Sequence, residues 1–352
     1  MTKRILVINL GGMGDILLSV PALRALRRRY PGARISLLAV PRTVELAGEF
    51  DFIDEVISFE FYDEGSRGFM PALNARKLRS LYRLLRGLRM QRFDMALNMR
   101  TLVSWAGAVK MALLFRVIGA GHSAGRDTEG RGFFFDTRIR ETGAGQKHEM
   151  EYDLDLASAL GADISERDMG LRIHDKDMAG ISRILKDSGI YGDEIIIGVN
   201  PGGMHSHRWP LKNFALVMNM LAGRLNCRFV VTGGALEREL AGRLEKMLDT
   251  RLIDLTGRTT IRELAALIKR CNLYITNDTG PMHIAAALET PLIAIFGPGY
   301  LTRFDPRRIS GRAVVFHKGA ECAPCNKTVC DSLRCFEGIS PEEVADASLR
   351  LL

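Results

Sequence analysis

Short apolar runs of strand type alternate with segments of helical periodicity, and this alternation occurs twice along the 352 residues. The first series starts at residues 4–9 and the second at residues 194–199. Alternating strands and helices predict a parallel sheet with helices on both faces. Because a chain of this length usually divides its core between two domains, we expect α/β domains at 1–175 and 190–340, followed by a helix at 341–352.

Two stretches of the first half depart from the alternation. Residues 102–121 are the longest apolar stretch, but Lys110 and Arg116 interrupt it and it falls short of a membrane span. We predict a buried helix there, followed by a strand at 116–119. Residues 122–147 are rich in glycine, arginine and threonine, which predicts a long surface loop. No signal peptide is recognisable, so we expect a soluble, cytoplasmic protein.

The formal net charge is +8, and the segment between Glu64 and Asp94 contains basic residues but no acidic ones. At 100° per residue, four arginines of that segment share one face of a helix and leucines share the other. These arginines are Arg76, Arg79, Arg83 and Arg86. Such a face suits an anionic acceptor, an anionic membrane surface or nucleic acid, and it is equally typical of a solvated surface helix.

The segment Asn-Asp-Thr-Gly-Pro-Met-His at 277–283 separates an apolar run from a helical one. The amides of a helix's first turn lack partners inside the helix, and the helix dipole adds positive potential there, so a phosphate ester fits. Asp278 or Thr279 can cap this helix, and Gly280 lets a ligand approach the backbone. The segment therefore predicts an anion site, with an ordinary capped turn as the alternative.

A second turn of this kind, Gly-Gly-Met-Gly at 11–14, follows the first apolar run. Its glycines are not spaced as in a dinucleotide-binding fingerprint, and no acidic residue follows the second predicted strand, where Val40-Pro-Arg42 stands. A dehydrogenase is therefore disfavoured. The turn instead places Asp15 at a helix start, where its carboxylate either stabilises the helix dipole by about 0.3–1 kcal/mol or takes part in catalysis.

Four polar, glycine-containing segments follow predicted strands: residues 11–15, 200–207, 232–237 and 277–283. Ligands of open α/β sheets bind outside the carboxyl ends of the strands. We therefore expect these segments at the ligand-binding edges of two sheets, on either side of a cleft between the domains.

Together these segments resemble glycosyltransferase family 9, the bacterial heptosyltransferases that build the inner core of lipopolysaccharide. The resemblance extends over nearly the whole chain and keeps the order and spacing of the motifs. These motifs are Gly-Gly-Met-Gly-Asp-Ile at 11–16, Asn-Pro-Gly at 200–202, Arg-Trp-Pro at 208–210, Gly-Gly-Ala-Leu-Glu at 233–237, Asp-Leu-Thr-Gly at 254–257 and the segment at 277–283. It implies a GT-B fold, in which two Rossmann-like domains face a cleft and the C-terminal helix crosses back toward the first domain.

The resemblance also implies an inverting, metal-independent enzyme that moves a heptose from ADP-heptose to a lipopolysaccharide inner-core acceptor, with no cofactor. Asp15 would be the general base for the acceptor hydroxyl. The first domain would bind the acceptor through Gly12, Met13, Gly14, Arg79, Arg83 and Arg86. The second would bind the donor through His207, Arg208, Gly233, Glu237, Asp278, Thr279, Gly280, Met282 and His283.

Within this donor set, the helix amides at Thr279, Gly280 and Met282 would stabilise the leaving diphosphate, a task that a metal ion performs elsewhere. Glu237 would accept hydrogen bonds from the ribose. Many relatives carry lysine where this chain has His207. The charge for a phosphate would then come from Arg208, which is permanently charged, or from His207 when it is protonated. We expect Trp209 to pack in the core.

Six cysteines divide into two groups. Four lie close together in sequence, at Cys322, Cys325, Cys330 and Cys335. Their spacing allows a zinc site of four thiolates, but the resemblance implies no metal there, and reduced free thiols are the preferred interpretation. Cys227 and Cys271 fall on predicted strands and are expected in the core.

Two alternative functions stay open. A relative that uses another nucleotide sugar or another glycan acceptor would carry the same motifs. A nucleic-acid-binding protein would account for the basic helix and the clustered cysteines, but it would leave the phosphate-binding turns unexplained, and aromatic residues are not interleaved with the arginines. The expected partners are therefore a nucleotide sugar, an anionic lipopolysaccharide-core acceptor and, peripherally, the inner membrane surface, with no nucleic acid.

Overall fold

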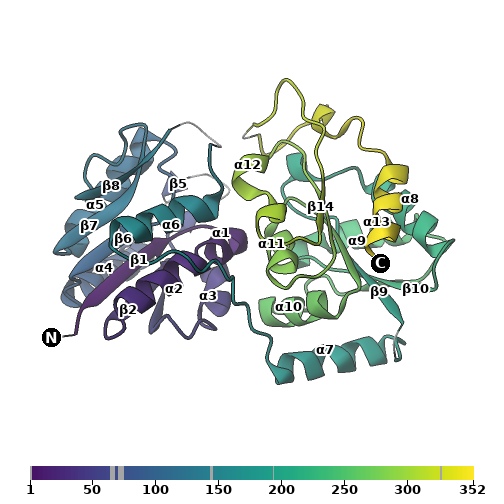
Figure 1. Cartoon of the computed structure of the whole chain (residues 1–352), viewed down its shortest axis with the longest axis horizontal. Coiled ribbons are helices and arrows are strands. Elements are labelled where there is room, and N and C mark those ends of the chain that lie inside the picture. Colours follow the sequence, from purple (N-terminus) through teal and green to yellow (C-terminus); the bar gives the residue numbers. More distant parts are fainter. Residues whose placement is uncertain (1, 64–67, 70–74, 143–145, 193, 326) are drawn as a thin grey trace. The chain divides into compact units, whose positions relative to one another are not determined.

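The computed structural model describes residues 2–63, 68–69, 75–142, 146–192, 194–325 and 327–352 (Figure 1). The chain forms two compact units, residues 1–169 and 170–352. Each unit has its own parallel sheet and its own hydrophobic core. The predicted α/β fold class is therefore confirmed.

Six parallel strands form the sheet of the first unit, in the order β3-β2-β1-β6-β7-β8. Their bounds are Glu55–Ser58, Arg34–Ala39, Arg4–Asn9, Met95–Asn98, His122–Thr128 and Thr137–Glu141. A short antiparallel pair, β4 (Tyr62–Asp63) and β5 (Gly68–Phe69), lies outside this sheet. The strand order reverses at the β1–β6 pair, and in sheets of this topology ligands bind in the crevice at the carboxyl ends of the two reversing strands.

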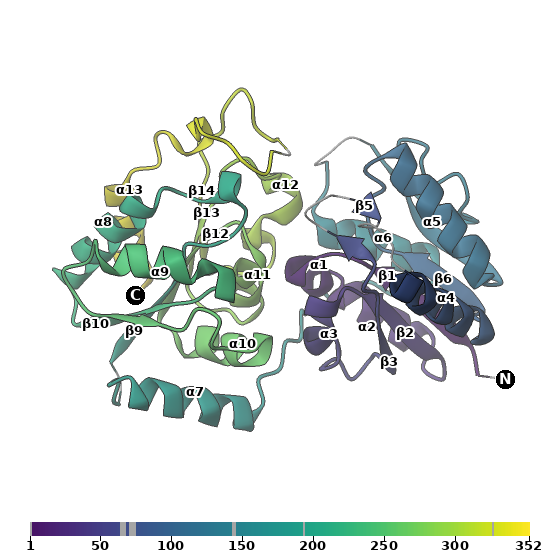
Figure 2. The same cartoon turned by 180° about the vertical axis from the view of Figure 1, so that it is seen from behind.

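Helices cover both faces of this sheet. In Figure 1 α2 and α6 lie in front of the strands, and in Figure 2, seen from behind, α4 and α5 do. α2 packs against α6, and α4 packs against α5 over alternate strand residues such as Leu6, Leu38 and Ala96. The helices of this unit are α1 (Met13–Leu18), α2 (Val20–Arg29), α3 (Pro41–Ala47), α4 (Ala75–Met90), α5 (Trp105–Ile118) and α6 (Glu149–Ala159).

The strand predicted at 116–119 is wrong, because these residues form the last turn of α5. The helix ends at Gly119, which adopts a left-handed conformation with φ of 64°. β-branched Val117 and Ile118 suggested a strand, but Ile118 packs in the same core as Leu114. The expectation that this helix is buried is also wrong, since only one of its faces meets the core.

The surface loop predicted at 122–147 is wrong as well, because it contains β7 and β8. Polar and glycine-rich composition concealed these strands. Gly125 on β7 allows close packing, since a Cβ there would lie 2.5 Å from the Phe135 ring. Arg126, the next residue, is fully buried among acidic partners. Tertiary contacts therefore override the local preference for a loop.

The second unit repeats this topology with six parallel strands in the order β11-β10-β9-β12-β13-β14. Their bounds are Leu252–Asp254, Cys227–Val231, Ile195–Asn200, Leu273–Asn277, Leu292–Ile295 and Ala313–Phe316. The order reverses at the β9–β12 pair, so the second unit has a switch point of its own.

The first and the last helix of the second unit each pack against another helix of that unit. α7 packs against α10, where Arg262 Nη2 lies 2.8 Å from Asp177 Oδ2. α13 packs against α8 and buries Val344 and Ala345 in the core of this unit, while its predicted return toward the first domain stays a prediction. These helices are α7 (Asp175–Asp187), α8 (Leu211–Ala222), α9 (Arg238–Glu245), α10 (Ile261–Arg270), α11 (Gly280–Ala287), α12 (Leu301–Phe304) and α13 (Pro341–Leu351).

Within the described residues, no helix of either unit combines the length and the apolar character that crossing a bilayer requires.

Candidate active site

A turn after β1 holds Asp15 at the switch point of the first sheet. Asn9, the last residue of β1, is buried and fixes this turn. Its side-chain carbonyl accepts the amide hydrogen of Gly11 (3.1 Å), and its side-chain amide donates to the Asp15 carbonyl (3.2 Å) and to Ser19 Oγ (2.8 Å). The turn is therefore tied to the strand end by a side chain that bulk water does not reach.

The carboxylate of Asp15 folds back over this turn. Its Oδ2 accepts the amide hydrogen of Gly12 at 2.7 Å, with Gly12 as the N-cap of α1 and Asp15 as its third residue. A Cβ on Gly11 would lie 2.5 Å from the Asp15 side chain, so packing requires glycine there. Met13 and Gly14 form the first turn of α1. The helix-start interaction predicted for Asp15 is thus present, and Oδ1 meets a different partner.

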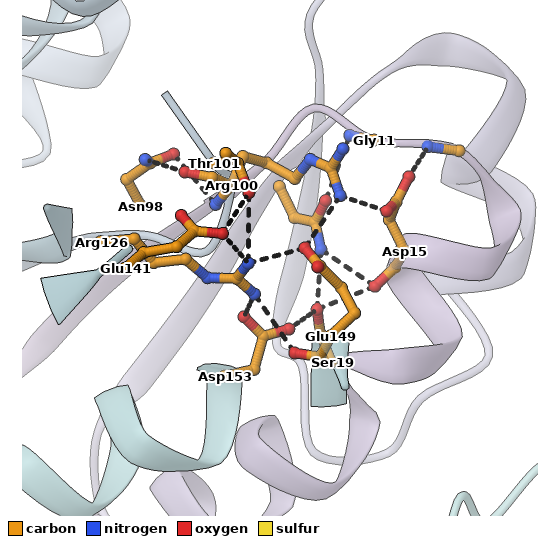
Figure 3. Close-up of polar contacts among 12 residues, drawn as sticks. Gly11, Asp15, Ser19, Asn98, Arg100, Thr101, Arg126, Glu141, Glu149 and Asp153 are labelled. Atoms are coloured by element: carbon orange, nitrogen blue, oxygen red, sulfur yellow. Dashed lines mark hydrogen bonds and ion pairs between the residues drawn. The ribbon is translucent and has the colours of Figure 1, made fainter. Parts of the chain in front are cut away.

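That partner is Arg100, which follows β6 on the other side of the switch point. Arg100 Nη1 donates to Asp15 Oδ1 and lies 3.6 Å from Glu149 Oε1 (Figure 3). The Asp15 and Arg100 side chains are 16% and 29% exposed, so a ligand can reach the pair from solvent. Sequence reasoning missed Arg100, although its place after a strand next to β1 could have indicated it.

Beneath this pair, the guanidinium of Arg126 is fully buried among three carboxylates. Arg126 lies 2.6 Å from Glu149, 2.5 Å from Asp153 and 3.9 Å from Glu141, and its guanidinium carbon lies 5.1 Å from the centre of the Tyr152 ring. Burial by itself lowers the pKa of Arg126, but the carboxylates outweigh burial and raise the pKa above its usual range. Arg126 therefore stays charged and joins β7, β8 and α6.

The cluster reaches the Asp15 turn through Asp153. Ser19 Oγ lies 2.6 Å from Asp153 Oδ2 and 2.8 Å from the Asp15 carbonyl oxygen, and its single hydrogen can be donated to either of them. Burial, and then the nearby charge of Glu149, raise the pKa of Asp153 to about 6, although Arg126 and Ser19 oppose the rise. The protonated, neutral form of Asp153 is therefore more favourable in this position than it is in water. No pattern of spacing in the sequence predicted these buried partners.

The second switch point is held by Asn277, the last residue of β12. Its side-chain amide donates to the carbonyls of Pro201 and Gly202, each at 3.0 Å, and its side-chain carbonyl accepts the Trp209 amide hydrogen at 3.0 Å. Trp209 is 1% exposed, and its ring lies edge-on to Phe214 at 5.2 Å. The prediction that Trp209 packs in the core is confirmed.

Three of the predicted donor residues surround Gly203. Glu237 Oε1 accepts the Gly203 amide hydrogen (2.7 Å), and Arg208 Nε donates to the Gly203 carbonyl (2.7 Å). A Cβ on Gly203 would lie 2.7 Å from Thr279 Cγ2. Glu237 Oε2 also accepts the Gly234 amide hydrogen (2.8 Å), so one carboxylate joins the loops after β9 and β10. The structure thereby brings Arg208, Glu237 and Thr279 together.

The start of α11 has fewer available amides than predicted. Thr279 is the N-cap and Gly280 the first residue, but the Met282 amide donates to the Thr279 carbonyl at 3.1 Å. The Met282 amide is therefore already hydrogen-bonded in this structure, and its part in donor binding stays a prediction. Met282 and His283 are buried, and the His283 ring lies 6.0 Å from the Phe304 ring.

Other predicted donor residues lie at the edges of this cluster. His207 is buried, with Nδ1 3.0 Å from Ser206 Oγ, and Ser206 Oγ donates to the Lys327 carbonyl. Gly233 lies against Glu237, since a Cβ there would be 2.7 Å from Oε2. Asp278 lies near Gly299, where a Cβ would be 2.1 Å from Asp278 Oδ2.

The basic side chains predicted for acceptor binding form a separate exposed face. Arg79, Arg83 and Arg86 are exposed on α4. Among the described contacts, no hydrogen bond or ion pair joins any of them to Asp15. Gly12, Met13 and Gly14 therefore adjoin Asp15, whereas a role of the arginines in acceptor binding stays a prediction.

The clustered cysteines do not form a metal-binding set in the described residues, where no three His, Cys, Asp or Glu side chains gather as ligands. Burial raises the pKa of Cys335, whereas a hydrogen bond between Cys330 and Ser332 lowers the pKa of Cys330. The free-thiol interpretation of this segment stays a prediction. Cys271 is buried as expected and Cys227 partly so, and burial raises their pKa values to about 12 and about 11.

Replacing Asp153 by asparagine tests the buried cluster through pH. With a pKa of about 6 folded and 3.8 unfolded, the folded protein retains a proton that the unfolded chain has lost, so this stabilisation disappears as pH rises through 6. Between about pH 5 and pH 7.5, we expect the free energy of unfolding of the parent to fall about 1 kcal/mol more than that of Asp153→Asn. Urea unfolding at both pH values measures this, with exposed Asp168→Asn as control. Equal falls in parent and Asp153→Asn would contradict the raised pKa.

A pair of glycine variants tests the loop around Glu237. Gly202→Ala places a Cβ 1.9 Å from Glu237 Oε1, and such crowding should lower the free energy of unfolding by about 1–3 kcal/mol. Gly242→Ala on α9 meets no atom within 4 Å and should raise it by about 0.5–1 kcal/mol, as expected inside a helix. Urea unfolding of both variants gives the comparison, and an unchanged Gly202→Ala protein would show that Glu237 moves freely.

The chain resembles characterised heptosyltransferases along its length. A family model, glycosyltransferase family 9 (heptosyltransferase), matches residues 81–335. Lipooligosaccharide heptosyltransferase 2 of Campylobacter jejuni is 32% identical over 164 residues, which are 45% of this chain and 51% of the relative, so that match spans about half of the relative's length. Lipopolysaccharide heptosyltransferase 2 of Salmonella typhimurium is 27% identical over 312 residues, 84% of this chain and 83% of the relative.

The fold agrees with these matches. The solved structure of E. coli ADP-heptose lps heptosyltransferase II aligns with a TM-score of 0.75 at 24% identity, covering 99% of this chain and 98% of that chain. This likeness confirms the GT-B fold class. Because the family model matches more than half of the chain, the protein belongs to glycosyltransferase family 9, the heptosyltransferase family.

Proposed function

We propose that this protein transfers a heptose from ADP-heptose to an inner-core sugar of lipopolysaccharide, with inversion and without a metal ion. Family membership and the names of the relatives support heptosyl transfer to such an acceptor. The observation that carries the proposal is the placement of Asp15, a partly exposed carboxylate at a switch point, oriented by the Gly12 amide on one oxygen and Arg100 on the other.

In the proposed reaction, the acceptor oxygen bonds to the anomeric carbon while the bond from that carbon to the β-phosphate oxygen breaks. The acceptor proton passes to Asp15, and ADP leaves from the opposite face, so the configuration inverts. Because Arg100 contacts Asp15 Oδ1, the acceptor hydroxyl must share or displace that contact. Arg100 would then be close enough to hold an anionic group of the acceptor.

The donor diphosphate would lie at the start of α11. Thr279 and Gly280 stand at the N-cap and first position of that helix, where amides lack an intrahelical partner and the helix dipole favours an anion. Arg208 adds a permanent positive charge near this helix start. Its guanidinium lies 3.9 Å from Glu237, and Glu237 accepts the amide hydrogen of Gly203, which lies against Thr279. These donors would stabilise the charge that develops on the leaving ADP.

Glu237 would hold the ribose of the donor. Each of its oxygens accepts one loop amide, from Gly203 or Gly234, and a carboxylate oxygen can accept a second hydrogen bond. The same carboxylate can therefore bind ribose hydroxyls without releasing the loops.

A second candidate is transfer from another nucleotide sugar. His207 favours it, because this side chain stands where relatives of the resembled family carry lysine, and its ring is buried against Ser206 and not displayed on the surface. In either case we propose a cytoplasmic enzyme at the inner membrane, with the arginines of α4 facing an anionic acceptor or the membrane. Family membership favours both transferases over a nucleic-acid-binding protein.

Asp15→Asn tests the general base. The variant keeps the shape and can still accept the Gly12 amide, but it cannot take a proton, so kcat should fall by about 10²–10⁴. ADP affinity should stay within a few-fold, measured by thermal shift against UDP and GDP, because Asp15 lies in the first unit. Asp168→Asn, exposed in the same unit, is the matched control. Transfer within a few-fold of the parent would leave Asp15 with a helix-start role only.

Chelation tests the metal-independent donor site. Transfer should proceed at an unchanged rate in excess EDTA, because amides and Arg208 replace a metal ion in the proposal. Asp278→Ala removes a side chain at the start of α11 and should weaken ADP affinity more than acceptor affinity. Initial rates with each substrate varied in turn separate the two effects. Activity that returns only when Mg²⁺ or Mn²⁺ is added would contradict the mechanism.

A further inference from the structure

Exposed apolar side chains of the first unit are concentrated in one stretch of its sequence. In the described part of this unit, every large apolar side chain that is exposed lies between residues 78 and 133. They are Leu78, Tyr82, Met90, Val103, Trp105, Val109, Leu113, Val117 and Phe133. Soluble proteins seldom expose such side chains contiguously unless the surface binds something.

The centre of this surface is a line of side chains on α5. Trp105, Val109 and Leu113 are spaced four residues apart, so they share one face of the helix, and they are 57%, 50% and 61% exposed. Phe133 extends the line, with its ring 6.3 Å from Trp105. We call these four side chains the α5 ridge.

A series of aromatic ring contacts connects the ridge to the core of the unit. Phe133 contacts Phe134 at 5.4 Å between ring centres, Phe134 contacts Phe135 at 4.2 Å, and Phe135 contacts Phe115 of α5 at 5.1 Å. Phe115 packs in the core on the opposite face of the helix. The ridge is therefore exposed on a helix that is already docked, and burying it requires something outside this unit.

The helix that carries the ridge and its neighbour α4 carry charge of one sign. α4 and α5 together contain eight lysines and arginines and no aspartate or glutamate. The two helices pack side by side (Figures 1 and 2), and Arg89 Nη1 of α4 donates to the Val117 carbonyl of α5 at 3.1 Å. An apolar line beside basic side chains complements the acyl region and anionic headgroups of a bilayer.

A second copy of the chain fits this surface less well. In a symmetric dimer each copy contributes the same patch, so two groups of arginines with no acidic partners on these helices would face each other. An anionic bilayer has the opposite charge and can accept the apolar side chains as well.

We propose that the α5 ridge inserts into the interfacial layer of an anionic lipid bilayer while the arginines of α4 contact the headgroups. This inference deepens the proposed function, because an acceptor on a lipid anchor lies at such a surface, but bilayer binding itself requires neither donor nor acceptor.

Tryptophan fluorescence tests the insertion directly. The chain has two tryptophans, of which Trp105 is exposed and Trp209 is buried. Without lipid, Trp105 should emit like an indole in water. Vesicles of phosphatidylcholine with about 30% phosphatidylglycerol should shift this emission to the blue, vesicles of phosphatidylcholine alone much less, and Trp105→Phe should remove the shift. An unshifted Trp105 in a protein that sediments with the anionic vesicles would overturn insertion of the ridge.

Paired variants separate the two parts of the surface. Val109→Gln/Leu113→Gln should weaken partition into the anionic vesicles by about tenfold, since two inserted apolar side chains are lost. Leu216→Gln, which replaces a 45% exposed leucine on α8, should leave partition unchanged. Arg79→Gln/Arg83→Gln/Arg86→Gln should weaken binding chiefly at low salt.

The outcomes also distinguish this inference from the proposed transfer. The Val109→Gln/Leu113→Gln protein should match the parent with a soluble, deacylated acceptor and lose rate only with acceptor in vesicles. If the parent transfers nothing to the soluble acceptor, the proposed function fails while vesicle partition still decides the inference. Partition equal to the parent, binding only to vesicles that contain acceptor, or a lipid-free dimer that the double variant dissociates would each overturn bilayer insertion.

Discussion

The fully buried guanidinium of Arg126 is the interaction on which the first unit's site depends. A buried charge is tolerated only when it is paired and hydrogen-bonded, and here Glu149 and Asp153 from α6 and Glu141 from β8 surround it. Through Ser19 the same cluster reaches the Asp15 turn. β7, β8 and α6 are thereby fixed relative to the turn that positions the candidate base, and removing one partner would leave an uncompensated charge in the core.

The two units hold the turns after their strands with similar hydrogen bonds. A glycine turn leaves the end of the first parallel strand of each unit, and an asparagine at that strand end, Asn9 or Asn200, accepts the amide hydrogen of the glycine two residues later. In each unit an acidic side chain folds back onto the amide of the glycine that caps the next helix, Asp15 onto Gly12 and Glu237 onto Gly234. An arginine also lies near each carboxylate. The two carboxylates therefore have similar surroundings, although the roles proposed for Asp15 and Glu237 differ.

Much of the fold followed from periodicity, since alternating strands and helices predicted both parallel sheets. The failures have one physical cause. β7 carries glycine, which is depleted in strands, and arginine, which is seldom buried, but Phe135 covers the glycine and the carboxylates pair with Arg126. α5 was expected to be buried because it lies in the longest apolar stretch of the chain, and composition does not reveal whether each face has a partner within the chain.

The sequence by itself determined the fold class, the glycine turns after the strands and the family, because these depend on residues close together in the chain and on their order. The tertiary structure alone decided that Arg100 meets Asp15 across the β1–β6 switch point, that Arg126 lies among three carboxylates, and that the Met282 amide is already used. Each of these contacts, except the last, joins segments distant in sequence, and the geometry of strand order and helix packing determines which side chains meet. The exposed ridge on α5 belongs to the same class, since exposure depends on what the rest of the chain leaves uncovered.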